Sequence, residues 1–339
     1  MNRILTSVAT ICMISAGALN PAEMQARTES TLTHGWQFAK VDSLGNRDAW
    51  QNVRVPHDWA IHEPFDRTHD LQVVAVEQNG ETEKTEKTGR TGGLPYMGRG
   101  IYTTTFEVPD TVGQHFTLVF DGAMSNPKVS VNGQHVGGWA YGYNSFHISL
   151  PTGVVHPGSN TLTVELENKP QSSRWYPGAG LYRNVHLIAT SKVHVPVWGT
   201  YVTTPYVSAD EASVKLITRI EGAAKGAAVD VNTEIIAPDG SVVATNNSIY
   251  HSHGQPFTQD FLVEKPKRWS PDTPWLYVAR TTLSVDGKAV DTYSTRFGIR
   301  SLEYIPEKGF FLNGEYTKFK GVCNHHDPVS YTHLRAHET

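Results

Sequence analysis

Alternation between apolar and polar residues dominates the chain from Ile101 onward and restricts it to β-structure. The pattern runs through IYTTTFEV, HFTLVF, KVSVNG, SFHISL, NTLTVELEN and NVHLIAT, and Gly, Pro, Asn or Asp separates these segments. A period of two places every second side chain on one face of a strand, so each segment predicts a strand with one buried face. No stretch downstream of residue 26 has helical periodicity. The pattern therefore predicts an all-β protein built as a sandwich or jelly roll.

Residues 27–192 are expected to form the first sandwich, a jelly roll. Within them, VSVNGQHVGG predicts a hairpin, because Asn132 and Gly133 are the residue pair preferred in a type I′ turn. A polar insertion, EQNGETEKTEKTGRTGG, interrupts this region. Its mixed charges favour a solvated excursion over a functional loop.

Residues 193–300 are expected to form a second sandwich of the immunoglobulin type. About seven alternating segments over roughly one hundred residues are typical of that fold. Turn pairs at Asp239-Gly240 and Asp286-Gly287 mark two of its hairpins. The disulfide of many such domains is absent. Three neighbouring residues are expected to fill the core in its place: Trp275, Leu276 and Tyr277.

The first 26 residues have the features of a secretory signal peptide. Arg3 supplies the positive charge, and the apolar stretch ILTSVATICMISAGAL follows it. Cleavage after Ala18 and cleavage after Ala26 both fit the small residues found there. The stretch is too short and too rich in small residues to predict a membrane span. We therefore expect an exported protein, periplasmic or secreted, with no membrane attachment once the signal is removed.

Charge and cysteine content exclude several classes of protein. The net charge of -4 gives no electrostatic basis for binding nucleic acid. Of the two cysteines, Cys12 lies in the predicted signal, so Cys323 alone remains and no disulfide framework is possible. The sequence contains no GxSxG elbow, phosphate loop, HExxH or CxxC motif. Stability must therefore come from packed cores.

A polar cluster near the end of the chain is the first candidate for chemistry: Asn324, His325, His326 and Asp327. Adjacent residues on a strand face opposite sides, so the two histidines do not easily chelate one metal ion together. One histidine and the carboxylate at a strand end could instead bond to hydroxyl groups. A surface strand end without function is the alternative.

A second candidate is SSRWYPGAGLYRNVHL, in which Trp175 and Tyr176 could stack on a sugar ring. Packing of these rings against a neighbouring domain is the alternative, and residue types alone favour it. Glycosidase chemistry also needs two carboxylates that flank the scissile bond. The sequence nominates no such pair.

The order of several motifs resembles glycoside hydrolase family two, which includes beta-galactosidases and beta-glucuronidases. VPHDWAI, GRGIYTTTFEV, VSVNGQHVGGWAYGYNSF and SRWYPGAGLYRNV are similar to its N-terminal jelly roll of the sugar-binding type. RWSPDTPWLY and YSTRFGIRSLEY are similar to its immunoglobulin-like middle domain. GFFLNGEYTKFKGVCNHHD resembles the beginning of its catalytic (β/α)₈ barrel.

The resemblance implies a role for the polar cluster. His325 matches a histidine on the first barrel strand that is implied to bind substrate, and Asn324, His326 and Asp327 are further candidates beside it. GVCNHHD is most like a beta-galactosidase, which implies a beta-linked oligo- or polysaccharide as substrate. The implied mechanism is retaining, with an acid/base Glu and a nucleophilic Glu on later barrel strands. These strands have no counterpart here.

The resemblance also bears on the cofactor, the oligomeric state and the activity of this chain. It allows for Mg or Na as a cofactor, without any ligand set assignable in this sequence, and for an oligomer of the full-length enzyme. A barrel needs roughly 250 residues, so residues 301–327 are expected to hold only its first strand. The chain by itself is expected to be inactive. The alternative is a secreted carbohydrate-binding or adhesion protein without catalytic activity.

The last segment has a separate interpretation. VSYTHLRAHET matches the in-frame translation of a transposase-end sequencing adapter throughout, so residues 328–339 are expected to be an adapter-derived tail, with a natural tail as the alternative. Residues 308–339 are expected to lack partner strands, and therefore to be disordered and cleaved early by proteases.

Overall fold

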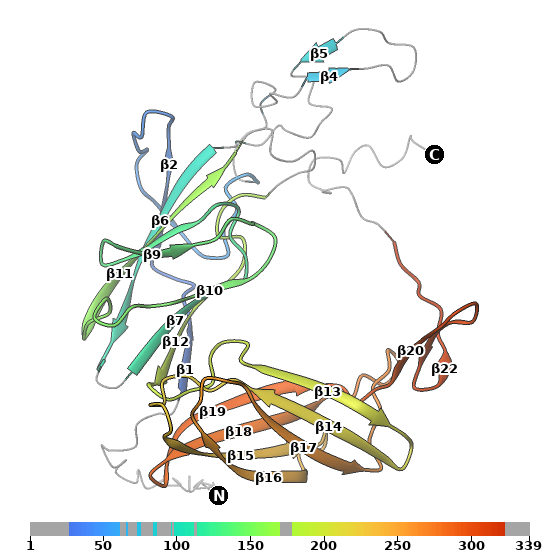
Figure 1. Cartoon of the computed structure of the whole chain (residues 1–339). Helices are drawn as coiled ribbons and strands as arrows, with labels where there is room; N and C mark the ends of the chain where they lie inside the picture. Colours follow the sequence, from blue (N-terminus) through green and yellow to red (C-terminus); the bar gives the residue numbers. More distant parts are fainter. Residues whose placement is uncertain are drawn as a thin grey trace, which may run out of the picture.

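Two β-sandwiches follow one another along the chain (Figure 1). The computed structural model describes residues 27–61, 66, 73–75, 84–86, 96, 98–111, 114–169 and 178–322. The regular elements in these ranges are strands, which confirms the expected all-β class. Within the same ranges, no helix of sufficient length and apolarity to cross a membrane occurs. The predicted signal peptide and the predicted adapter tail lie outside the described residues.

The first sandwich packs a four-stranded sheet against a six-stranded sheet, and neighbouring strands are antiparallel. The smaller sheet runs in the order β1 (Arg27–Thr31), β12 (Val185–Ser191), β7 (Gln114–Phe120) and β10 (Phe146–Ser149). The larger sheet runs β3 (Gln51–Val53), β2 (Trp36–Val41), β6 (Gly98–Val108), β11 (Gly158–Asn168), β8 (Lys128–Val131) and β9 (Gln134–Gly138). A separate pair consists of β4 (Val73–Ala75) and β5 (Lys84–Glu86).

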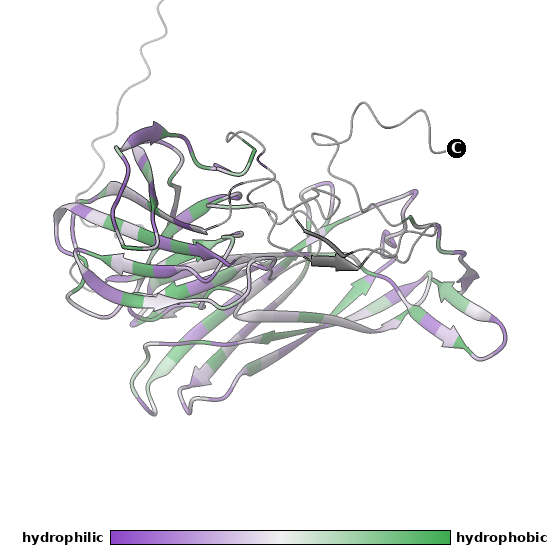
Figure 2. Ribbon diagram, turned by 90° about the horizontal axis from the view of Figure 1, so that it is seen from above, coloured by the Kyte–Doolittle hydropathy of each residue, from purple (hydrophilic) through white to green (hydrophobic). Residues whose placement is uncertain are grey.

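The period of two explains the core of this sandwich. Along β11, Leu162, Val164 and Leu166 point inward, where they share one apolar cluster with Leu118 and Phe120 of β7. The same alternation of apolar and polar residues is visible along the strands in Figure 2. Each large side chain fully buried in this way contributes about 1.5–3 kcal/mol. Packing alone can therefore hold a sandwich that has no disulfide.

The second sandwich packs a three-stranded sheet against a four-stranded sheet. The smaller sheet runs β13 (Thr200–Val207), β14 (Glu211–Thr218) and β17 (Phe257–Glu264). The larger sheet runs β16 (Val242–His251), β15 (Ala228–Ile236), β18 (Tyr277–Val285) and β19 (Lys288–Phe297). This arrangement agrees with the expected immunoglobulin-like sandwich.

A buried polar layer lies between the two apolar clusters of this core. Thr233 of β15 donates from its hydroxyl to Oε1 of Gln259 at 2.7 Å, and it is also hydrogen-bonded to Thr281 of β18 at 2.9 Å. The Gln259 amide donates to the carbonyl oxygen of Val231 at 3.2 Å. Burying these groups is tolerated because their polar atoms have partners inside the core.

The prediction that three neighbouring residues fill this core is wrong for two of them. Tyr277 is buried, with 2% of its surface exposed, but Trp275 and Leu276 are 44% and 43% exposed. The reason is that β18 begins only at Tyr277, so the two preceding residues lie in the turn-rich segment before the strand. The Trp275 ring lies on the surface beneath the ammonium group of Lys267, at 5.5 Å.

The expectation that the chain from residue 308 onward lacks partner strands is wrong as far as Tyr316. A three-stranded sheet forms there from β20 (Leu302–Ile305), β21 (Gly309–Leu312) and β22 (Glu315–Tyr316). Asn313 attaches this sheet to the second sandwich, because its amide donates to the carbonyl oxygen of Trp269 at 2.9 Å. Residues 323–339, and with them the predicted barrel strand, lie outside the described residues.

Candidate functional site

The polar cluster predicted from the sequence lies outside the described residues, as do Trp175 and Tyr176. The structure therefore says nothing about Asn324, His325, His326 or Asp327. For the described part of the chain, no three His, Cys, Asp or Glu side chains are grouped so that they could hold a metal ion.

Three of the sequence motifs meet at one end of the first sandwich. We call this contact the motif junction and define it as residues 57–59 packed against residues 178–181. The backbone N–H of His57 donates to the carbonyl oxygen of Leu181 at 2.8 Å. Met124 and Gly180 exchange two backbone hydrogen bonds of 2.9 Å. The motif junction thus joins segments that are more than one hundred residues apart in the sequence.

Side chains at the motif junction serve to hold the backbone. Oδ1 of Asp58 accepts the backbone N–H groups of Ala60 at 2.8 Å and Ala179 at 2.9 Å. The hydroxyl of Tyr102 is hydrogen-bonded to Nδ1 of His57 at 2.7 Å. Burial raises the pKa of Tyr102 far above its usual range, so this phenol stays neutral. These contacts hold the two backbone segments together as a structural clamp.

Gly180 is required at the motif junction for two reasons. Its φ of +101° lies in the left-handed region, which L side chains rarely adopt. A Cβ atom at this position would also lie 2.4 Å from the Tyr102 hydroxyl and 2.6 Å from the carbonyl oxygen of His57. The two segments can approach this closely only because residue 180 has no side chain.

An exposed row of aromatic residues lies beside the motif junction. We call it the aromatic loop and define it as residues 139–143, which connect β9 to β10. Its three rings are each about half exposed: Trp139 (44%), Tyr141 (58%) and Tyr143 (52%). Tyr182 holds the loop in position by donating from its hydroxyl to the carbonyl oxygen of Gly142 at 2.7 Å.

The orientation of the Trp139 ring is fixed by two contacts within the sandwich. Its ring stacks on Phe146 with centroids 5.8 Å apart and an interplanar angle of 3°, and its indole N–H donates to Oδ1 of Asn144 at 2.9 Å. A rigid aromatic face with polar groups at its edge suits the C–H face of a sugar, whose hydroxyls lie around the rim. The aromatic loop therefore has the features of a surface on which a sugar ring could stack. The five residues WAYGY already carry this signal in the sequence.

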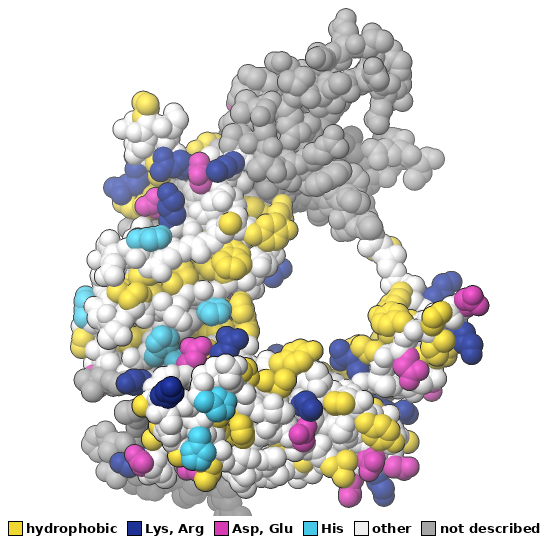
Figure 3. Space-filling view, viewed as in Figure 1, with side chains coloured by type: hydrophobic (Ala, Val, Ile, Leu, Met, Phe, Trp, Pro, Cys, Tyr) yellow, Lys and Arg dark blue, Asp and Glu magenta, His cyan; other side chains and the backbone are white. Residues whose placement is uncertain are grey.

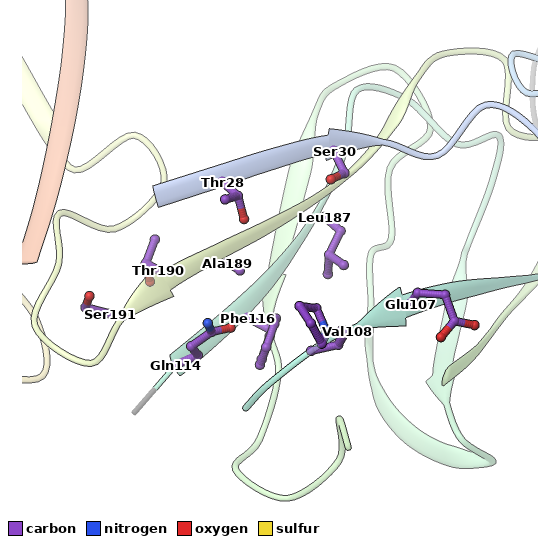
Figure 4. Close-up of a pocket in the computed structure, with 11 residues that line it drawn as sticks. Thr28, Ser30, Glu107, Val108, Gln114, Phe116, Leu187, Ala189, Thr190 and Ser191 are labelled. Carbon is purple, nitrogen blue, oxygen red and sulfur yellow. The ribbon is translucent and has the colours of Figure 1, made fainter. Parts of the chain in front are cut away.

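A small cavity of about 260 Å³ opens between the two sheets of the first sandwich (Figure 4). Phe116, Leu187 and Val108 form its apolar floor, while Thr28 and Gln114 lie among its polar groups. Its volume is below the range of about 300–1,000 Å³ that small-molecule sites usually have. We assign no ligand to it.

Comparison with known proteins gives the family. The protein-family model for glycosyl hydrolases family 2 matches residues 193–300 of this chain. A beta-galactosidase of Bacteroides ovatus is 35% identical to this chain over 313 residues, in an alignment that covers 89% of this chain and 35% of the relative. The chain belongs to family 2 of the glycosyl hydrolases.

Further relatives agree with this assignment. A beta-glucuronidase of Bacteroides fragilis is 28% identical over 68% of this family 2 chain and 35% of its own length. The solved structure of a family 2 member from Bacteroides cellulosilyticus superposes with a TM-score of 0.76 at 29% identity, covering 88% of this chain and 39% of that one. The family 2 chain thus spans about a third of the length of the curated relatives it matches.

Proposed function

We propose that this chain is the N-terminal part of an exported family 2 glycosidase that hydrolyses beta-linked sugars, with a beta-galactoside as its substrate. The observation that carries the proposal is the 35% sequence identity to a beta-galactosidase over 89% of this chain. The alignment covers only 35% of the length of that relative. The two sandwiches match the non-catalytic part expected in this family, and the remaining length of the enzyme supplies the catalytic domain.

The proposed chemistry is a retaining double displacement. Two glutamates of the remaining part would act as acid/base and as nucleophile, at a carboxyl separation of about 5 Å. In this proposal His325 binds the substrate, and Asn324, His326 and Asp327 lie beside it on the first barrel strand. The described residues would then position that barrel and would not themselves cleave the bond. Export rests on the signal-like features of the first 26 residues.

The test compares two proteins. The genomic coding sequence is recovered beyond codon 327, and the extended protein and the present chain are assayed side by side on chromogenic beta-galactosides and beta-glucuronides. We expect the extended protein to hydrolyse the galactoside, the present chain to be inactive, and a Glu→Gln change at an Asn-Glu pair of the extension to abolish turnover. Turnover by the present chain alone would overturn the proposal.

A carbohydrate-binding or adhesion protein is the second candidate, and the exposed aromatic loop is the observation that favours it. On this alternative the genomic sequence has a stop codon soon after the second sandwich, and the chain retains glycan affinity without any hydrolysis. Preferential hydrolysis of the glucuronide by the extended protein would instead correct the sugar while keeping the reaction.

A further inference from the structure

A cavity of about 510 Å³, which we call the junction cavity, lies where the two sandwiches meet. Strands β1, β7 and β12 contribute one side of it, and β19 together with the segment before β13 contributes the other. In the space-filling view, histidine, acidic and basic side chains gather along this boundary (Figure 3). Small-molecule sites commonly have volumes of about 300–1,000 Å³ and occur preferentially at domain interfaces. The junction cavity has the size and position of such a site.

An ion pair between the sandwiches fixes the walls of the junction cavity. Arg27 of β1 donates from Nε and Nη2 to the two carboxylate oxygens of Asp291 in β19, at 3.0 and 2.9 Å. Asp291 is fully buried and also accepts the backbone N–H of Val195 at 2.8 Å. The guanidinium lies 4.8 Å from the ring centre of Tyr293, which lines the cavity. The cavity therefore exists before any ligand arrives.

Trp198 provides an aromatic wall. It lines the cavity, is 56% exposed, and has a φ of +55°, which is costly for a residue with a side chain. Its backbone N–H donates to the Tyr293 hydroxyl at 3.2 Å, and its ring meets that of His147 edge-on at 5.2 Å. The backbone N–H of Gly199 donates to the carbonyl oxygen of Pro196 at 2.9 Å, so Trp198 occupies the third position of a turn, where glycine is the usual residue. Such outliers cluster at ligand sites.

Another part of the cavity lining, which we call the polar wall, consists of polar side chains. Nε2 of His186 lies 3.1 Å from a carboxylate oxygen of Asp121, and Nδ1 lies 3.4 Å from one of Glu29. The two acidic side chains are 36% and 59% exposed, so they remain accessible from the cavity. Ser145 also lines this wall. Carboxylates accept hydrogen bonds from hydroxyls, and hydroxyl and imidazole groups can both donate and accept.

We propose that the junction cavity binds a neutral saccharide of one or two units, with one sugar ring against Trp198 and its hydroxyls on the polar wall. A neutral ligand fits because the charge of Arg27 is already matched by Asp291, whereas Glu29 and Asp121 would repel a carboxylate. The same wall does not fit a metal ion, since the described residues contain no group of three ligands. The proposal concerns binding by the described residues, so it can fail while the hydrolase proposal stands, and the reverse is also true.

Calorimetric titration of the full chain at pH 7 with galactose, lactose and glucuronic acid tests this. We expect the neutral sugars to bind, glucuronic acid to bind at least tenfold more weakly, and Trp198→Ala to raise the dissociation constant for the neutral sugars at least tenfold. Trp198→Gly should have the same effect while relieving backbone strain, because glycine adopts a φ of +55° without cost. It therefore separates loss of the ring from loss of the fold, which circular dichroism monitors.

Trp275→Ala is the matched control, because it removes a ring of 44% exposure that belongs neither to the junction cavity nor to the aromatic loop. We expect it to leave binding at the junction cavity unchanged. If Trp139→Ala abolishes binding and Trp198→Ala does not, the saccharide binds at the aromatic loop and the proposal is wrong. Absence of measurable heat with both neutral sugars, or equal affinity for glucuronic acid, overturns it as well.

Discussion

Replacing Arg27 by alanine removes the only basic side chain that is paired with Asp291 among the described residues. The carboxylate is fully buried and the Arg27 side chain is 15% exposed, so water replaces little of what is lost. The backbone N–H of Val195 remains as a donor to the carboxylate. The variant therefore places an uncompensated negative charge at the contact between the two sandwiches.

The structure sets the size of the effect. Three hydrogen bonds from the guanidinium are lost, two to the Asp291 carboxylate and one to the carbonyl oxygen of Val195, and a single bond to a charged group contributes about 1.5–3 kcal/mol. The contact with the Tyr293 ring adds about 0.5–1 kcal/mol. Removing one partner of a buried ion pair generally lowers the free energy of unfolding of a protein by about 3–5 kcal/mol. We therefore expect Arg27→Ala to lower the free energy of unfolding by about 3–5 kcal/mol.

Urea denaturation followed by tryptophan fluorescence and by circular dichroism measures this change. With a slope of about 2 kcal/mol per molar urea, the expected loss lowers the midpoint by roughly 1.5–2.5 M. Arg280→Ala is the matched control: Arg280 forms a short ion pair of 2.7 Å with Glu234, but both side chains are largely accessible, at 46% and 32% exposure. Loss of an exposed pair should cost only about 0.2–1 kcal/mol.

The double variant Arg27→Met with Asp291→Leu distinguishes charge from packing. Replacing a buried pair by apolar residues of similar volume is often neutral or stabilising. The double variant should therefore recover most of the loss. The reasoning is refuted if Arg27→Ala costs no more than Arg280→Ala. It is also refuted if the double variant is as unstable as Arg27→Ala, because the loss would then come from shape and not from the buried charge.

Two further changes test other parts of the fold. Gly180→Ala should destabilise the first sandwich by about 1–3 kcal/mol more than Gly153→Ala. Both glycines have positive φ, but only residue 180 has backbone and side-chain atoms within 3 Å of the new methyl group. Thermal unfolding of the two variants measures the difference, and equal losses of stability would contradict the prediction. His115→Gln should flatten the decline of stability between pH 7 and pH 5. Burial and, to a smaller extent, His194 lower the pKa of His115, so the unfolded chain binds its proton more readily and the folded state loses stability as the pH falls below about 6.5. Urea midpoints at several pH values measure this, and parallel profiles for variant and wild type would show the attribution to be mistaken.

Local turn chemistry made several hairpins predictable. Asn132 and Gly133 have φ of +51° and +79°, and Asp286 and Gly287 have +51° and +73°, which fits the type I′ turn expected from their residue types. The Asn-Gly pair at residues 313–314 also has positive φ, and it connects β21 to β22. The same signal was present there in the sequence. Giving it weight would have predicted the small sheet that was missed.

Long-range contacts were not predictable in the same way. Tyr277 lies at an inward position of a strand, whereas its apolar neighbours Trp275 and Leu276 precede the strand, and composition does not reveal where β18 begins. The motif junction could not be predicted for a similar reason, since Asp58 and Ala179 are 121 residues apart in the sequence and only the fold brings them together. The resemblance to a family identified these segments as motifs, but it did not predict the hydrogen bonds between them.

The buried layer of Thr233, Gln259 and Thr281 has a consequence for how the second sandwich tolerates change. Sliding a strand by a single residue would turn every inward side chain outward, so the three polar groups would lose their partners together. The layer therefore favours one register of the strands over the others. A register shift would therefore leave several buried polar atoms without partners at once, which penalises every alternative pairing of these strands.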